Sequence, residues 1–152
     1  MRAAWVIGVV LGAASAHAQA PGFVELTVAA LGSGAGGIGA AGDSRLPLRP
    51  RDVRDDNGTL RLRASGARGS VRDVELSVPA SAVGSAVAVG EGATLRLTFA
   101  SGQALEPRPG AGTVTLESWD GSAVRGAFDA DLVQGRMTLH VHGRFEGAVG
   151  AR

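Results

Sequence analysis

Two histidines near the end of the chain are the side chains best suited to chemistry. His140 and His142 are two residues apart in an alternating segment, so both should project from the same face of one strand. The hairpin register that we expect here sets Asp129 opposite His140, on that same face. Catalytic zinc commonly has three protein ligands, so two imidazoles and one carboxylate can form a divalent-metal site. Metal binding by His140, His142 and Asp129, with or without catalysis, is therefore one hypothesis.

The neighbours of this histidine pair favour a surface without metal. Thr138 and Arg144 share the face, and an arginine disfavours a nearby cation. Nucleophilic catalysis needs a base held beside a serine or cysteine, but the chain has no cysteine and no Gly-x-Ser-x-Gly motif. Paired carboxylates for sugar hydrolysis stay open, since any two acid-bearing strands can bring a pair together. We expect a protein without cofactor that is not an enzyme, with metal binding as the alternative.

The segments that must position these residues alternate between apolar and polar side chains. In residues 59–64, Leu60 and Leu62 should face a core, while Arg61 and Arg63 face solvent. Similar alternation marks other segments, at residues 23–31, 71–78, 83–89, 94–99, 113–117, 124–132 and 137–145. Beyond the N-terminal region, no segment has the spacing of an amphipathic helix. The sequence predicts an all-β fold, an antiparallel β-sandwich of about eight short strands.

Turn signals separate these segments. The dipeptide Asn57-Gly58 accepts positive φ angles and predicts a tight hairpin, and Asp120-Gly121 predicts a type I′ turn. Pro47 and Pro50 restrict residues 45–54 to an extended or edge conformation. The acidic residues before Asn57 lack the spacing of a calcium loop, so they too indicate a turn.

The last two strands repeat one pattern, valine, glycine and phenylalanine on a single face, in residues 124–129 and 141–146. Inward residues must pair with inward residues, and the register that sets Gly126 opposite Gly143 satisfies this rule. Two facing glycines would leave a notch on the inner surface. We expect a phenylalanine or Trp119 to pack into it.

This C-terminal pattern resembles that of a group of uncharacterised exported bacterial β-sandwich domains. The matching tripeptides are Gly112-Thr113-Val114, Gly126-Ala127-Phe128 and Gly143-Arg144-Phe145. The resemblance covers mainly residues 112–148 and implies a β-sandwich that follows a signal sequence. Many members of the group are lipoproteins, whereas this chain has no cysteine to acylate. No activity and no catalytic residue follow from the resemblance.

The N-terminus has the three parts of a cleavable secretory signal. Arg2 supplies a positive charge, Ala3–Ala14 is an apolar stretch, and Ala16-His17-Ala18 offers small residues to a signal peptidase. The apolar stretch is too short for a spanning helix, so we expect export to the periplasm or the medium without a transmembrane anchor. The expected organisation is a signal peptide at 1–18, an N-terminal strand and glycine-rich linker at 19–44, and an antiparallel β-sandwich domain at 45–152.

Charge is distributed unevenly along the chain, which has 15 basic and 14 acidic residues. Residues 45–72 contain eight arginines and three aspartates, whereas residues 73–152 are net acidic. Either the arginines form a patch for an anionic partner, or the two regions neutralise each other, which we favour. Aromatic residues are absent between Phe23 and Phe99, so no platform for stacking nucleic-acid bases is expected. The sequence favours a structural or binding role, with an envelope protein or a polysaccharide as partner.

Overall fold

The computed structural model describes residues 21–31 and 41–150. The proposed signal peptide at 1–18 and most of the glycine-rich linker lie outside these residues. The described elements are β1 (Gly22–Leu31), β2 (Gly42–Leu48), η1 (Pro50–Asp52), β3 (Val53–Asp56), β4 (Thr59–Ser65), β5 (Val71–Pro79), η2 (Ala80–Ala82), β6 (Ala86–Ala88), β7 (Thr94–Phe99), β8 (Ala104–Leu105), β9 (Gly112–Trp119), β10 (Ala123–Gln134) and β11 (Met137–Ala148).

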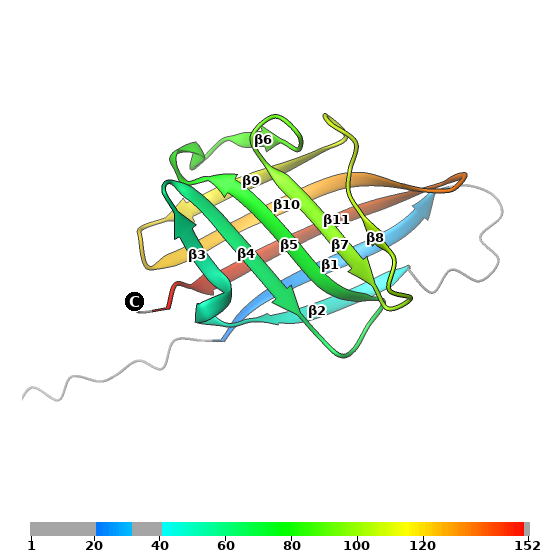
Figure 1. The fold of residues 1–152 in the computed structure, drawn as a ribbon, viewed down its shortest axis with the longest axis horizontal. Coiled ribbons are helices and arrows are strands. Elements are labelled where there is room, and N and C mark those ends of the chain that lie inside the picture. Colours follow the sequence, from blue (N-terminus) through cyan, green and yellow to red (C-terminus); the bar gives the residue numbers. More distant parts are fainter. Residues whose placement is uncertain (1–20, 32–40, 151–152) are drawn as a thin grey trace, which may run out of the picture.

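The strands form two antiparallel sheets, which confirms the predicted all-β class. One sheet has the order β2-β1-β11-β10-β9-β6 and the other the order β3-β4-β5-β7-β8. The two sheets lie face to face, and the strands of one cross those of the other obliquely (Figure 1).

The described residues contain eleven strands, so the expected number of about eight is wrong. Pro50 begins the short turn η1, which splits the single extended segment expected at residues 45–54 into β2 and β3. These two strands belong to different sheets. Strands β6 and β8 have three and two residues, too few for alternation to reveal them.

Strand β1 lies inside the six-stranded sheet, between β2 and β11. Its residues Val24, Leu26 and Val28 are buried in the same core as the rest of the chain. The strand expected within residues 19–44 is thus an inner strand of the main fold. The boundary expected between residues 44 and 45 falls inside β2.

The alternating residues face the core as the sequence predicts. Leu60 and Leu62 of β4 are buried, while Arg61 and Arg63 between them are exposed. Fully burying one leucine side chain contributes about 1.5–3 kcal/mol to stability. The other strands of both sheets, apart from the short strands β6 and β8, repeat this arrangement, so the core is a continuous apolar layer between the sheets.

The hairpin of β10 and β11 has a different register from the expected one. Gly126 pairs with Phe145 and Phe128 pairs with Gly143, so the expected pairing of the two glycines is wrong by two residues. A Cβ atom on Gly126 would lie 2.4 Å from Cζ of Phe145, and one on Gly143 would lie 2.4 Å from Cζ of Phe128. Each ring therefore covers a glycine on the partner strand, and the expected notch does not form.

Two predicted turns have different outcomes. Asn57 and Gly58 have φ angles of 52° and 87°, which confirms the tight hairpin between β3 and β4. At the second turn only Gly121 has a positive φ, so the predicted type I′ geometry is wrong. The carboxylate of Asp120 instead accepts hydrogen bonds from the backbone N–H groups of Ser122 and Ala123, both at 2.8 Å. These bonds close a longer loop.

Strand β2 is an edge strand, and its sequence suits that position. Pro47 pairs with Phe23 of β1, and because proline has no N–H its missing donor must lie on the free edge. There it hinders the addition of another strand. On the inner side, the buried Ser44 hydroxyl accepts a hydrogen bond from the Val71 N–H at 3.3 Å. This bond connects β2 to the first residue of β5 in the other sheet.

Candidate functional site

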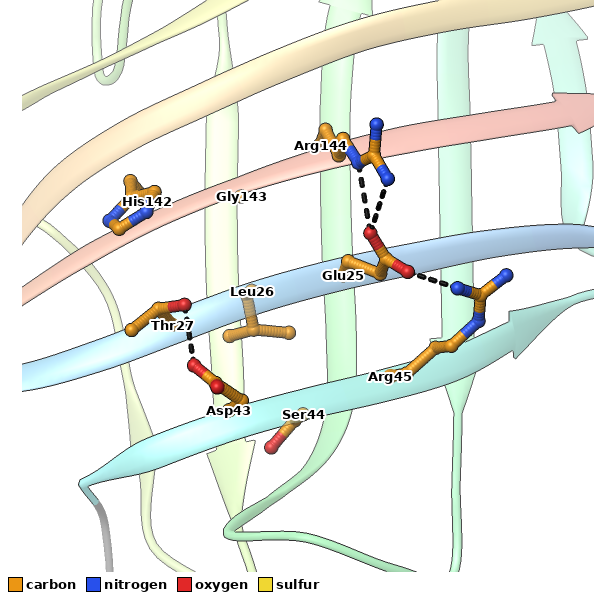
Figure 2. Close-up of a pocket in the computed structure, with 9 residues that line it drawn as sticks. All are labelled: Glu25, Leu26, Thr27, Asp43, Ser44, Arg45, His142, Gly143 and Arg144. Atoms are coloured by element: carbon orange, nitrogen blue, oxygen red, sulfur yellow. Dashed lines mark hydrogen bonds and ion pairs between the residues drawn. The ribbon is translucent and has the colours of Figure 1, made fainter.

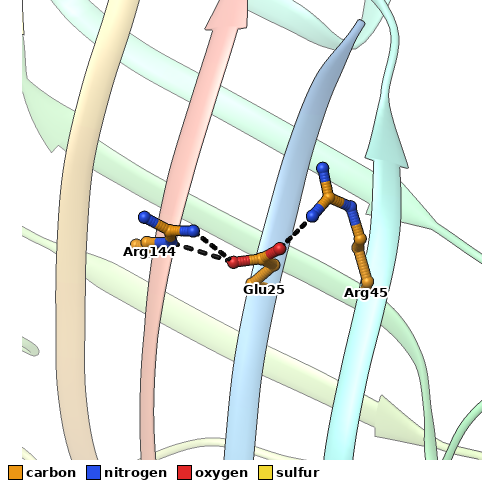
Figure 3. A network of polar contacts seen from close by, with 3 residues as sticks. All are labelled: Glu25, Arg45 and Arg144. Atoms are coloured by element: carbon orange, nitrogen blue, oxygen red, sulfur yellow. Dashed lines mark hydrogen bonds and ion pairs between the residues drawn. The ribbon is translucent and has the colours of Figure 1, made fainter.

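The outer face of the six-stranded sheet carries a row of charged residues across β2, β1 and β11. Glu25 is opposite Arg45 on one side and opposite Arg144 on the other. Because Val24 and Leu26 point into the core, Glu25 between them must point outward. The sheet thus brings an arginine, a glutamate and a second arginine side by side from three distant segments (Figure 3).

Glu25 holds both arginines of this row. Its Oε2 accepts hydrogen bonds from Arg144 Nε at 2.9 Å and from Arg144 Nη2 at 2.7 Å. Its Oε1 accepts one from Arg45 Nη1. The hydrogen bonds from Arg144 lower the pKa of Glu25, partial burial acts in the opposite direction, and Arg45 lowers the pKa further. The carboxylate therefore stays ionised and fixes two guanidinium groups.

The ring of Phe23 supports the same two arginines. The Cζ atom of Arg45 lies 4.3 Å from the ring centroid, and that of Arg144 lies 5.4 Å away. Both distances are within the range of cation–π attraction. Phe23 and Glu25 are two residues apart on β1, so ring and carboxylate project from the same face. Together they restrain the guanidinium groups more than an isolated surface ion pair would.

A second polar row lies beside the first and helps to form a shallow hollow. Thr27 Oγ1 donates a hydrogen bond to Asp43 Oδ1 at 2.7 Å, and Thr27 pairs across the sheet with His142. The hollow has a volume of about 600 Å³ and extends over β2, β1 and β11 (Figure 2). Its ionisable lining comprises Glu25, Asp43, Arg45, Arg144 and His142. The charges of the two acids and the two arginines cancel.

Of the residues of the metal hypothesis, His142 lines the hollow, while His140 and Asp129 are not part of its lining. Their arrangement differs from the expected one. Asp131 is opposite His140 and Asp129 is opposite His142, so the expected pairing of Asp129 with His140 is wrong. His140 nevertheless contacts both carboxylates, with Nδ1 at 2.8 Å from Asp131 and Nε2 at 3.3 Å from Asp129. The hydrogen bond with Asp131 raises the pKa of His140, burial lowers it, and the charge of Asp129 raises it again.

This geometry gives the metal hypothesis no ligand set. Both ring nitrogens of His140 face carboxylates, which favours the protonated imidazolium over a metal-binding neutral ring. The ring centroids of His140 and His142 are 6.3 Å apart. In the part of the chain that the structure describes, no three or more histidine, aspartate or glutamate side chains form a group that could hold a metal ion. Metal binding by these residues stays a prediction.

Sequence reasoning missed the site around Glu25. The alternation of Phe23, Glu25 and Thr27 marks them as outward residues, but it does not name their partners. Arg45 and Arg144 are 20 and 119 residues away from Glu25. A pairing over such distances depends on strand order, for which a single sequence has no local signal.

Comparison of the chain with protein-family models, with curated proteins and with solved structures finds no match in any of the three. No helix within residues 21–31 and 41–150 is long and apolar enough to cross a membrane. The fold and this surface define the class: an all-β protein of two antiparallel sheets, one of which displays ion-paired arginines on its outer face.

Proposed function

We propose that this protein is an exported, non-enzymatic binding domain of the periplasm or the extracellular medium. Its partner is an envelope protein that docks on the hollow of the six-stranded sheet. The observation that carries the proposal is the double ion pair of Glu25 with Arg45 and Arg144. Arginines held in place before binding lose little conformational entropy when a partner arrives, and arginine is enriched in protein interfaces.

The hollow suits a protein better than a polysaccharide. Its two arginines are balanced by two acids, so it has no surplus charge to attract an acidic sugar chain. The ring of Phe23 beside it is covered by two guanidinium groups and offers no free platform for a neutral one. Apolar side chains are also exposed on this face: Leu31 is 53% exposed and Val133 is 39% exposed. Both residues pair with Thr138 of β11, which places them on the strands to either side of it. Mixed charges beside apolar residues are typical of a protein interface.

The geometry of the histidines supports a binding role over catalysis. His140 is engaged by two carboxylates, so its ring is used as an ion-pair partner. A general base for nucleophilic catalysis would instead have to contact a hydroxyl or thiol.

Export is supported by the signal-like residues 1–18 alone. The direct test is the mass of the protein recovered from the periplasm or medium of an expressing bacterium. Cleavage after Ala18 predicts a mature chain that begins at Gln19. Recovery of the uncleaved chain from the cytoplasm would contradict this part of the proposal.

The binding surface is tested by cross-linking capture from the envelope of the source organism. Capture should fall about tenfold in the double variant Arg45→Ala and Arg144→Ala, because the partner loses two charged contacts. The matched control is Arg63→Ala with Arg96→Ala, which removes two arginines from the other sheet. The control should capture the same partner as the unmodified protein. Equal capture by all three proteins would refute the proposed surface.

A further inference from the structure

The outer face of the five-stranded sheet collects much of the basic segment at residues 45–72. It forms a hollow of about 520 Å³ over η1, β4, β5 and neighbouring strands. Four arginines and two acids account for its ionisable lining: Arg51, Arg54, Arg61, Arg63, Asp52 and Glu75. The hollow has a net charge of +2, while the hollow on the six-stranded sheet is neutral.

Two of these arginines are placed directly against each other. Arg54 of β3 pairs across the hairpin with Arg61 of β4, and like charges in directly opposite positions destabilise a sheet. Arg61 has an ion pair with Asp56 at 3.2 Å. Arg54 Nε contacts the carbonyl oxygen of Arg51 at 3.5 Å. The structure therefore concentrates positive charge at a point where stability alone would favour a different residue.

The arginines of the hollow that pair with acids keep most of their side-chain surface exposed to solvent. Arg63 Nε lies 3.3 Å from Glu75, and Arg51 Nε lies 3.9 Å from Asp52. In each case, as for Arg61 Nε with Asp56, the contact with the acid involves Nε. All the arginine side chains concerned are largely exposed. The guanidinium forks can therefore receive carboxylates in the bidentate geometry that arginine favours.

Most ion pairs of these arginines are local, contrary to the favoured expectation that the two regions of the sequence neutralise each other. Arg61 and Arg51 pair with acids of their own segment. Arg63 pairs with Glu75 of the acidic region. A surplus positive charge therefore remains at this hollow on the five-stranded sheet.

We propose that this basic hollow binds an acidic polysaccharide through carboxylate groups spaced along the sugar chain. The site is on the opposite sheet from the hollow of the proposed function and does not depend on it. Ser77 and Thr94, whose hydroxyls are 2.6 Å apart, line the side of the hollow away from β3. They provide hydrogen-bonding groups of the kind that sugar hydroxyls need. The arginines would bind the carboxylate groups of the polysaccharide, and these hydroxyls would bind its sugar hydroxyls.

Two other polyanions fit this surface less well. Nucleic acid binding without sequence preference uses aromatic side chains on which bases stack, and the residues lining the hollow include none. Peripheral membrane binding combines charge with buried apolar side chains. The exposed large apolar residues of the described chain are Leu31, Val83 and Val133, none of which lines this hollow.

The test is binding of the purified protein to polygalacturonate, with neutral dextran as the uncharged comparison. Affinity for polygalacturonate should fall about tenfold in the double variant Arg54→Gln and Arg61→Gln, because two charged contacts are lost. It should also fall as salt rises, since charge drives the association. The matched control is Arg45→Gln with Arg144→Gln, which removes the same charge from the other face and should retain affinity.

The conservative variant Arg54→Lys with Arg61→Lys separates charge from geometry. It should bind more tightly than the glutamine pair and less tightly than the unmodified protein, because lysine keeps the charge and lacks the fork. Thermal unfolding of each variant shows that it is folded. Absent polygalacturonate binding, equal binding of dextran, or equal losses in both glutamine pairs would overturn the proposal. Tighter binding to single-stranded DNA or to anionic phospholipid vesicles would overturn it as well.

Discussion

Each outer face of this protein carries a row of arginine, glutamate and arginine on three neighbouring strands. The rows are Arg45, Glu25 and Arg144 on the six-stranded sheet, and Arg63, Glu75 and Arg96 on the five-stranded sheet. The residue types are identical, and the contacts are not. Glu25 binds both of its arginines, whereas within the described residues Glu75 forms an ion pair with Arg63 alone.

The environment of each carboxylate explains the difference. The side chain of Glu25 is 28% exposed and that of Glu75 is 44% exposed. Phe23 gives the guanidinium groups of the first row a ring to pack on, and no aromatic side chain lines the hollow beside the second row. Identical charge patterns thus produce a row of restrained arginines on one sheet and a more exposed, less restrained row on the other.

The largest expected effect concerns the inner packing that holds the first row in place. Gly126→Ala should destabilise the protein by about 1–3 kcal/mol, because overpacking strains a filled core. The new Cβ would lie 2.4 Å from Phe145 Cζ and 2.4 Å from the Thr115 carbonyl oxygen. Because that oxygen belongs to the backbone, movement of the ring alone cannot relieve the clash. Urea unfolding measures the change.

The control for this substitution is Ala127→Ser, which changes the next residue of β10 on the opposite face of the sheet. It should alter the free energy of unfolding by less than about 0.5 kcal/mol. If Gly126→Ala proved as harmless as the control, the close packing of glycine against phenylalanine would not be a constraint on this sheet.

Replacing one arginine by threonine should have a smaller effect on stability, and the sign of that effect should differ between the two faces. Arg54→Thr should stabilise the protein by about 0.2–1 kcal/mol, because it removes a like-charge pair with Arg61 and threonine suits a strand. Arg144→Thr should instead lower stability slightly, because Glu25 loses two hydrogen bonds. Thermal and urea unfolding of both variants provide the measurement. Destabilisation by Arg54→Thr would mean that the hairpin tolerates its two arginines at no cost.

The smallest expected effect is a pH-dependent contribution to stability from His140, which lies on the six-stranded sheet. The pKa of His140 is raised in the folded protein, chiefly by Asp131 and also by Asp129. Its partner on β1 is Ala29, which adds no charge, while the nearest titratable group on β11 is His142. The contribution of His140 to stability is therefore complete below about pH 6.5 and is lost as the pH rises through the raised folded value.

Urea unfolding between about pH 6 and about pH 9 tests this dependence. The unmodified protein should be more stable than His140→Gln at the acidic end, and the difference should shrink as the pH rises. Binding at the arginine-lined hollow of the other sheet should stay constant over the same range, because no histidine lines it. A difference that grew with pH would contradict the raised pKa.

Much of the fold follows from the sequence alone, because the signals involved are local. Alternation at Leu60 and Leu62 decides which face of β4 is buried, since successive side chains of a strand point to opposite sides. Asn57-Gly58 determines a tight hairpin, because asparagine and glycine adopt positive φ with little strain. These preferences act over a few residues and need no knowledge of the remaining chain.

The tertiary structure decided how the strands are matched. Alternation requires inward residues to pair with inward residues, and a shift of two residues satisfies that rule equally well. Packing of Phe145 over Gly126 selected between the two registers and thereby placed Asp131 opposite His140. Strand order likewise brought Glu25 between two arginines from distant segments. Residue types set the charges on each face, and long-range pairing set which of those charges meet.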